Sequence, residues 1–332
     1  MNILVGDIGG TKTILSIFSQ ESEDGKPLAE TSFPSAHFKT FDEIVHKFMS
    51  GNDLKVQKAC FGVAGPVFGN HAQVTYLSWE IDADALKSKY KFSAVGLLND
   101  LESVAYAVPI LKAQDVFTLT AGEPVKSGNI AILAPGTGLG EGFLTYENGR
   151  YIAHASEGSH ASFAPVNDLQ LGLWQFLKQK GYKHISFERV CSGGMGVPLL
   201  YEYLKSIQKA PEPDWLKEKL AASDDPTPVI FETAHDHERP AALAIATVDL
   251  FIEILGSEAG NLALKVLSTG GLYLGGGMSP RILSELQKPA FLEAVCDKGR
   301  FQSLLTKMPL HVILNAKAGL LGAAAYGRSA LN

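Results

Sequence analysis

Two glycine-rich segments that carry hydroxyl and carboxylate side chains are the strongest chemical signals in the sequence. The first is Gly6-Asp7-Ile8-Gly9-Gly10-Thr11, and the second is Gly136-Thr137-Gly138. Small residues let backbone N–H groups approach phosphate oxygens, and threonine adds a hydroxyl donor. Taken alone, either segment also fits an ordinary tight turn. Because there are two, we interpret them as phosphate-binding hairpins, with Asp7 able to hold Mg²⁺ through water.

A third glycine-rich loop, Gly275-Gly276-Gly277, follows the β-prone run Leu272-Tyr273-Leu274 and precedes a predicted helical stretch from about Pro280. Other phosphate-binding motifs do not fit the sequence. It contains no G-x-x-x-x-G-K-[ST], and the segment from Gly136 to Glu141 lacks the last glycine of G-x-G-x-x-G. The sequence therefore excludes P-loop and dinucleotide-binding folds of those kinds.

Asn99-Asp100 is a candidate catalytic pair, because it follows the apolar run Val95-Gly96-Leu97-Leu98. A carboxylate at the end of such a predicted strand can act as a general base toward a hydroxyl group. Asn-Asp is also typical of a helix N-cap, and the sequence alone leaves both interpretations open. Glu188-Arg189 likewise fits a surface charge pair, whereas His160 stands among small residues that offer little core for it to fill.

The elements around these motifs alternate between β-prone and helical segments, which is typical of an α/β protein with its sites at strand ends. Both hairpins consist of a strand, a Gly/Thr turn and a second strand. We expect helices over 41–49, from 100 to about 111, over 169–179, 199–207 and 241–267. The Pro- and Asp-rich segment 211–228 is predicted to be a surface excursion with one short helix around 215–220.

Composition and charge narrow the classes of partner. The chain has 332 residues, 46% of them hydrophobic and 19% charged, which suits a globular protein of two lobes. The formal net charge is −6 and the basic residues are scattered, so we expect no nucleic acid and no membrane partner. The segment 235–238, His-Asp-His-Glu, fits no regular metal-ligand spacing.

The location is predicted to be cytoplasmic. The first residues, Met1 to Asp7, have no basic region typical of a signal peptide, and charged residues interrupt the apolar stretch 241–267. Three widely spaced cysteines, Cys60, Cys191 and Cys296, suit reduced thiols.

Taken in order, the motifs resemble those of bacterial-type glucokinases of the class without a zinc site. The resemblance covers nearly the whole chain and rests on several spaced motifs, which together are more specific than any one of them. The matching segments are 6–11, 61–66 (Phe-Gly-Val-Ala-Gly-Pro), 98–100, 136–140, 157–160 (Glu-Gly-Ser-His), 188–190, 270–271, 275–277 and 319–322. Two positions depart from the family pattern: Tyr76 stands where an Asn is common, and Ser159 where a Gly is common.

This resemblance implies a two-lobed actin-like ATPase fold, which is ribonuclease H-like, with the active site in the cleft between the lobes. It implies a small lobe of residues 1–110 plus 315–332, a large lobe of 111–314, and a homodimer. The implied activity is transfer of the γ-phosphoryl group of MgATP to the 6-hydroxyl of glucose, which gives glucose 6-phosphate and ADP at the first step of glycolysis.

The resemblance also implies roles for individual residues. Asp100 is implied to be the catalytic base. The residues implied to bind glucose are Asn99, Asp100, Glu157, His160 and Glu188, whose polar groups suit a polyol. The residues implied to bind ATP are Gly6, Asp7, Ile8, Gly9, Gly10, Thr11, Gly136, Thr137, Gly138, Gly275, Gly276 and Gly277.

Three alternatives stay open at this point. A broader hexokinase would also accept mannose or glucosamine. A sugar-responsive regulator on a kinase scaffold would need a DNA-binding domain, for which the phosphate hairpin starting at Gly6 leaves no room. A filament-forming ATPase would have no use for Glu157, His160 and Glu188.

Overall fold

The computed structural model describes residues 1–19, 26–75 and 77–331. The chain forms two compact units. The first comprises Met1–Asp115, Tyr146–Ala155 and Asn315–Asn332, and the second comprises Val116–Thr145 and Ser156–Leu314. Residues 146–155 thus group with the first unit, although they lie in the sequence range of the large lobe expected above.

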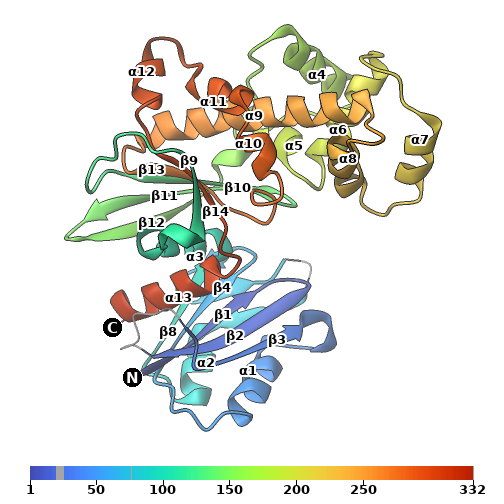
Figure 1. Cartoon of the computed structure of the whole chain (residues 1–332). Coiled ribbons are helices and arrows are strands. Elements are labelled where there is room, and N and C mark those ends of the chain that lie inside the picture. Colours follow the sequence, from blue (N-terminus) through green and yellow to red (C-terminus); the bar gives the residue numbers. More distant parts are fainter. Residues whose placement is uncertain (20–25, 76, 332) are drawn as a thin grey trace. The chain divides into compact units, whose positions relative to one another are not determined.

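The first unit contains a five-stranded sheet in the order β3-β2-β1-β4-β8 (Figure 1). Its strands are β1 (Asn2–Ile8), β2 (Lys12–Ser19), β3 (Ala29–Pro34), β4 (Lys58–Val63) and β8 (Ala94–Asn99). The first three strands are antiparallel neighbours, and β1, β4 and β8 run parallel. Because the ends of parallel strands meet at one edge, β1 and β8 bring Asp7 and Asn99-Asp100 toward the same edge of this sheet.

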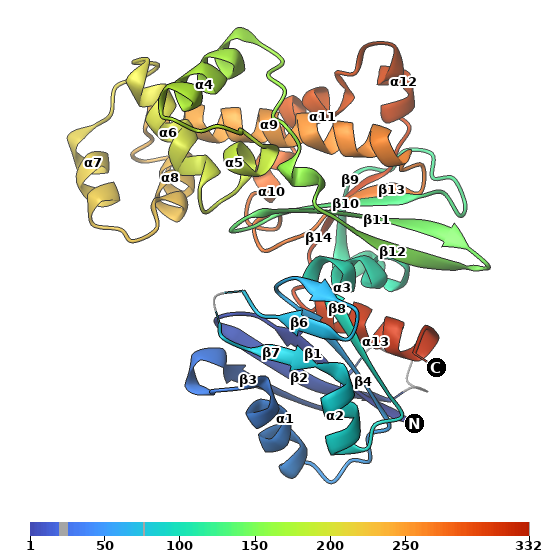
Figure 2. The same cartoon turned by 180° about the vertical axis from the view of Figure 1, so that it is seen from behind.

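Helices cover both faces of this sheet (Figures 1 and 2): α1 (Phe41–Ser50) and α2 (Ala83–Tyr90) lie on one face, and α3 (Asp100–Ala107) and α13 (Ala318–Ser329) on the other. The alternation of side chains along β1 explains this arrangement. Leu4 and Ile8 join the apolar cluster on the α1 face, whereas Ile3 and Val5 join the cluster that contains residues of α13. A small third sheet consists of β5 (Val67–Phe68), β6 (His71–Gln73) and β7 (Glu80–Asp82).

Helices α3 and α13 approach each other so closely that only glycine fits at their crossing. A methyl group at Gly322 would lie 1.6 Å from the carbonyl oxygen of Ser103. This contact fixes the start of α3, and therefore Asp100, against α13.

The second sheet has six strands in the order β12-β11-β10-β13-β14-β9. They are β12 (Arg150–Ser156), β11 (Leu139–Glu147), β10 (Ile130–Pro135), β13 (Gly271–Leu274), β14 (Leu310–Ile313) and β9 (Val116–Thr120). The long helix α9 (Ala242–Val266) lies across the strands, with α5 (Phe187–Cys191), α6 (Gly196–Ser206), α8 (Pro226–His235) and α11 (Pro289–Cys296) packed around it (Figure 2). The remaining helices of this unit are α4 (Asp168–Gln179), α7 (Asp214–Ala221), α10 (Leu283–Leu286) and α12 (Gln302–Leu305).

Most of the predicted helices are confirmed, and the exceptions have local causes. The helix after Asp100 ends at Ala107 and continues only as a 3-10 turn, Val108–Ile110, which contains Pro109. Helix α8 was not predicted, yet Asp225 caps it and Pro226 occupies its first position, a common helix start. The stretch predicted from about Pro280 becomes two shorter helices, α10 and α11.

Helix α9 is the longest helix, with 25 residues. Across the part of the chain that the structure describes, no helix is both long and apolar enough to cross a membrane.

Candidate active site

The first predicted phosphate hairpin is the turn between β1 and β2, and Ser35 braces it. The Gly9 N–H donates to the carbonyl oxygen of Lys12 at 3.0 Å. The Ser35 hydroxyl donates to the Gly9 carbonyl oxygen at 2.7 Å, and the Ser35 N–H donates to the Thr11 carbonyl oxygen at 3.0 Å. These bonds hold the turn in one conformation. Ser35 could not be predicted from the sequence, because no local motif marks it.

Gly6 and Ile8 lie within β1, before the turn. A methyl group at Gly6 would meet Leu15 and Phe61 at 2.8 Å, so packing accounts for this glycine. The side chain of Ile8 is fully buried in the core. The residues of the first motif in the turn itself are Gly9, Gly10 and Thr11.

Asp7 lies beside two features that suit a cation or phosphate site. Burial and the negative charge of Asp100 raise the pKa of Asp7 to about 6, while Lys12 opposes this shift. The first turn of α13 is also close, since a methyl group at Gly319 would lie 3.8 Å from the Asp7 carboxyl. The Asp7 carboxyl, whose charge Asp100 disfavours, offers oxygen donors that fit a hard cation such as Mg²⁺.

Asn99 ends β8 and Asp100 begins α3. The helix-cap interpretation and the catalytic interpretation of this pair therefore concern the same two side chains. The Asn99 side-chain oxygen accepts the N–H groups of Leu101 at 2.8 Å and Glu102 at 3.1 Å, and Glu102 completes a capping box. The amide nitrogen of Asn99 donates to no described residue. The Asn99 oxygen thus caps the helix, and its nitrogen is left for another acceptor.

The Asp100 carboxylate is fixed by the helix that it starts. Its Oδ1 accepts the N–H of Leu101 at 2.9 Å. Partial desolvation raises the pKa of Asp100, and backbone N–H groups at the helix start lower it in part. A raised pKa makes a carboxylate a stronger base.

In the second unit, the Gly136–Gly138 turn joins β10 to β11 and is supported by the segment that follows α5. The Gly136 N–H donates to the Gly138 carbonyl oxygen at 2.9 Å. Gly193 donates to the Gly136 carbonyl oxygen at 2.8 Å, and Gly194 donates to the Thr137 carbonyl oxygen at 3.0 Å. A methyl group at Gly193 would lie 2.8 Å from the Gly136 carbonyl oxygen, and a methyl group at Gly194 would lie 2.8 Å from the Thr137 carbonyl oxygen. Both glycines are therefore required for this close approach.

The loop 275–277 lies against the same turn. Gly275 donates to the Leu133 carbonyl oxygen at 2.8 Å, and Met278 donates to that of Pro135 at 3.3 Å. Gly276 has a φ of +75°, and a methyl group there would lie 2.5 Å from the Pro135 carbonyl oxygen. The structure thus brings together the two glycine-rich segments of the second unit that the sequence assigned to ATP.

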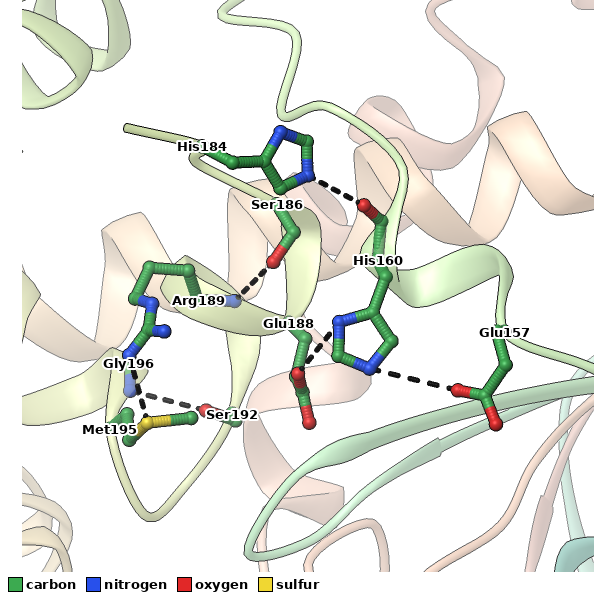
Figure 3. Close-up of polar contacts among 9 residues, drawn as sticks. All are labelled: Glu157, His160, His184, Ser186, Glu188, Arg189, Ser192, Met195 and Gly196. Atoms are coloured by element: carbon green, nitrogen blue, oxygen red, sulfur yellow. Dashed lines mark hydrogen bonds and ion pairs between the residues drawn. The ribbon is translucent and has the colours of Figure 1, made fainter. Parts of the chain in front are cut away.

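Glu157, His160 and Glu188 form a polar cluster in the second unit (Figure 3). His160 Nδ1 lies 3.2 Å from Glu188 Oε2, and His160 Nε2 lies 3.6 Å from Glu157 Oε2. The Glu188 side chain is 22% exposed, whereas that of Glu157 is 89% exposed. A methyl group at Gly138 would lie 2.7 Å from Glu188 Oε1, so Glu188 also borders the Gly136–Gly138 turn.

Neighbouring side chains fix this cluster (Figure 3). Ser186 caps α5 by accepting the Arg189 N–H at 3.2 Å, which places Glu188 in the first turn of that helix. His184 Nε2 lies 2.8 Å from the carbonyl oxygen of His160. Arg189 stacks over the Tyr182 ring at 5.0 Å, so the surface pair of Glu188 with Arg189 that the sequence left open does not form.

The predicted site residues thus fall into one group in each unit. The first unit holds Asn99 and Asp100 with the turn after Asp7, and the second holds Glu157, His160 and Glu188 with 136–138 and 275–277. Tyr76, one of the two departures from the family pattern, lies outside the described residues. Five residues of the site were not predicted from the sequence. The adjacent glycines Gly193 and Gly194 are themselves a sequence signal, whereas no local pattern marks Ser35, His184 and Ser186.

Comparison with known proteins gives the family. Residues 4–330 match the family model described as Glucokinase. A glucokinase of Nostoc punctiforme is 40% identical over 335 residues, which is 97% of both chains. The crystal structure of a glucokinase from an Antarctic psychrotroph is 30% identical, covers 99% of each chain and superposes with a TM-score of 0.86.

A more distant structure shares the fold. A ROK family glucokinase from Streptomyces griseus, solved in complex with glucose and AMPPNP, is 20% identical, with 99% coverage of each chain and a TM-score of 0.60. The two-lobed actin-like ATPase fold class expected from the sequence is the fold of these structures. With a matching family model and a relative at 40% identity along nearly its whole length, the chain belongs to the glucokinase family.

Proposed function

We propose that this protein phosphorylates glucose at its 6-hydroxyl with MgATP, giving glucose 6-phosphate and ADP at the first step of glycolysis. One observation carries the proposal beyond family membership. Glu188 lies against Gly138 of a glycine-rich turn and 3.2 Å from His160, so hydroxyl-binding groups and a phosphate-type turn share one place in the second unit.

The polar cluster of the second unit suits a sugar. Carboxylates accept hydrogen bonds from hydroxyl groups, and histidine can donate or accept. Glu157 and His160 are accessible, and Glu188 is partly buried, so a bound hexose would exchange water for these groups. A sugar with a misplaced hydroxyl would leave one of them unpaired, which gives selectivity a physical cause.

Asp100 is proposed as the general base, with Asn99 as a sugar ligand through its free amide nitrogen. The backbone bond to Leu101 orients the carboxylate, and partial desolvation strengthens it as a base. It would accept the proton of the 6-hydroxyl as that oxygen attacks the γ-phosphorus. Phosphoryl transfer depends mainly on positioning and charge neutralisation, so base catalysis contributes about 10²- to 10⁴-fold.

The glycine-rich segments are proposed to bind ATP. Backbone N–H groups of 9–11 and 136–138 would contact phosphates, and the loop 275–277 would lie along the nucleotide. Asp7 would hold Mg²⁺ through water. When bound, the ion neutralises charge on the transferred phosphoryl group.

The proposal also covers the division into lobes, the oligomeric state and the location of the enzyme. The lobes 1–110 plus 315–332 and 111–314, the homodimer and the cytoplasmic location follow from the resemblance and the sequence. Cys60 and Cys191 are buried free thiols, which suits a reducing compartment. The broader hexokinase stays the alternative, because Ser159 and Tyr76 depart from the family pattern.

A coupled assay over a panel of hexoses and phosphoryl donors tests the proposal. We expect glucose with MgATP to give the highest kcat/KM, with mannose and glucosamine well below it. Equal kcat/KM for these three sugars would replace glucokinase by the broader hexokinase. If no hexose is phosphorylated with any donor, the kinase assignment is wrong.

A further inference from the structure

A carboxyl group that the proposed mechanism does not use is buried beneath the sugar-binding turn. Glu141 lies on β11, three residues after Gly138, and is 1% exposed. Its carboxyl packs against the backbone of the 157–160 turn, since a methyl group at Gly158 would lie 2.3 Å from Glu141 Oε2. The Gly158 N–H is bonded to Ser156 Oγ at 3.0 Å, so the carboxyl supports this turn by direct packing.

A second buried carboxyl, Glu258 on α9, lies close enough for its negative charge to add to the effect of burial in raising the pKa of Glu141. Glu258 is fully buried, and its own partners are the Lys265 ammonium at 3.2 Å and the Asn261 amide at 2.8 Å. No donor among the described residues reaches Glu141 Oε1. A buried carboxyl oxygen without a donor or a paired cation favours the neutral acid over the carboxylate.

The charges around Glu141 agree with a protonated acid. Among the described residues no cation pairs with Glu141, because the Lys265 ammonium pairs with Glu258 and the Lys298 ammonium bonds to Ser257 Oγ at 3.2 Å. Burial and the Glu258 carboxyl raise the pKa of Glu141 to about 8, although Lys265 opposes the shift. The other titratable groups near these two carboxyl groups are Cys191 on α5, Lys298 after α11, and Glu157 and His160 in the turn above.

We infer that Glu141 is a positioning residue for glucose binding: its carboxyl, protonated at neutral pH, supports Gly158 and so places Glu157 and His160. This inference rests on the proposed role of the 157–160 turn in binding the sugar. When Glu141 loses its proton, an unpaired negative charge is buried against Gly158 and is repelled by the negative charge of Glu258. The turn is then displaced, and glucose binds more weakly.

The test is the KM for glucose of four proteins between pH 6.5 and 9: the wild type, Glu141→Gln, Glu141→Ala and Glu147→Gln. Gln imitates the protonated acid in shape and cannot ionise, whereas Ala removes the support. Glu147→Gln is the matched control, because Glu147 is exposed at the end of the same strand.

At pH 7 we expect Glu141→Ala to raise the KM for glucose about tenfold, with a smaller effect on the KM for ATP, and Glu141→Gln to stay within about threefold of wild type. In the wild type and Glu147→Gln, the KM for glucose should rise as the pH passes through 8. In Glu141→Gln, this rise should be absent.

Two results would overturn the inference. One is the same alkaline rise in Glu141→Gln as in the wild type, and the other is equal KM values for Glu141→Gln and Glu141→Ala at pH 7. Because Glu141→Gln preserves the side-chain shape, its pH profile decides the matter even if Glu141→Ala does not fold. A wild type without hexokinase activity would instead contradict the proposed function, so the two failures are distinguishable.

Discussion

At the scale of single residues, the proposed base Asp100 has an unusually close counterpart elsewhere in the chain. Asn99-Asp100 caps and starts α3, and Asn167-Asp168 caps and starts α4, where Asn167 accepts the Gln170 N–H and donates its amide to Glu253 Oε1 at 2.5 Å. Asp168 is exposed and lies outside the proposed site. The second pair therefore provides controls that share the Asn cap and the Asp at the helix start but not the proposed chemistry.

We expect Asp100→Asn to lower kcat by about 10²- to 10⁴-fold, because the amide cannot accept the proton of the attacking hydroxyl. The KM for ATP should change little. Steady-state kinetics of Asp100→Asn and Asp168→Asn check this, and Asp168→Asn should match the wild type. A near wild-type kcat in Asp100→Asn would remove Asp100 as the base.

Asn99 has two roles that different substitutions separate. Asn99→Ala removes the capping oxygen and should lower the free energy of unfolding by about 1 kcal/mol; Asn167→Ala, which also removes the bond to Glu253, should lower it by at least as much. Asn99→Ser keeps a capping oxygen and should retain most of the stability. Denaturant unfolding measures these differences.

Glucose affinity tests the second role of Asn99. Both Asn99→Ala and Asn99→Ser lack the amide nitrogen, so both should raise the KM for glucose, whereas Asn167→Ala should not. If Asn99→Ser binds glucose as tightly as the wild type, Asn99 is a structural cap alone.

Sequence reasoning at this scale identified residue types but not their contacts. Asp100 was expected at a strand end, and it directly follows β8. The contact of Glu188 with both His160 and Gly138 could not be predicted, because it joins the Gly136–Gly138 turn, the 157–160 turn and α5. Glu141 gave no signal, since its burial depends on α9, more than a hundred residues away.

At the scale of elements, the Gly136–Gly138 turn depends on the segment that follows α5. Gly193→Ala should raise the KM for ATP about tenfold, because the added methyl would lie 2.8 Å from the Gly136 carbonyl oxygen and push the turn aside. Gly51→Ala is the control, since its methyl would make only ordinary contacts, the nearest at 3.6 Å. Nucleotide titration of both variants measures the effect, and unchanged ATP affinity in Gly193→Ala would show that the turn does not bind phosphates.

Elements with a strong local pattern were predictable, and those set by distant packing were not. Helix α9 was expected at 241–267 and spans Ala242–Val266, because its apolar residues recur at helical spacing. Helix α2 was missed, as its short sequence is polar on most positions and is started by the Asp82 cap. The β-prone runs around both glycine turns were confirmed as antiparallel hairpins.

At the scale of the whole molecule, Glu141 should make stability depend on pH. The pKa of Glu141 is about 8 in the folded protein, whereas its ordinary value, which applies to the unfolded chain, is 4.5. Between pH 4.5 and pH 8, folding is therefore accompanied by uptake of a proton. Stability from the protonated form is complete below about pH 4.5 and is lost as the pH rises toward 8. The loss is at most about 1.4 kcal/mol per pH unit.

Glu141→Gln does not take up this proton, so its unfolding temperature relative to wild type should increase from pH 5 to pH 8. Thermal unfolding of both proteins in matched buffers measures the difference, with Glu147→Gln as the control. A constant difference over this range would show that Glu141 is ionised in the folded state at neutral pH.

The fold class was predictable at this scale because the ordered motifs are spread over nearly the whole chain. The grouping of residues 146–155 with the first unit was not, since no compositional change marks either end of that segment.

The central claim is that the chain moves a phosphoryl group from ATP to the 6-hydroxyl of glucose. The most direct measurement follows glucose and MgATP by ³¹P NMR in the presence of the protein. We predict that glucose 6-phosphate and ADP form in equal amounts. Inorganic phosphate should form no faster than it does from MgATP in the absence of glucose. Inorganic phosphate as the main product, or a phosphate on another hydroxyl, would contradict the proposed function.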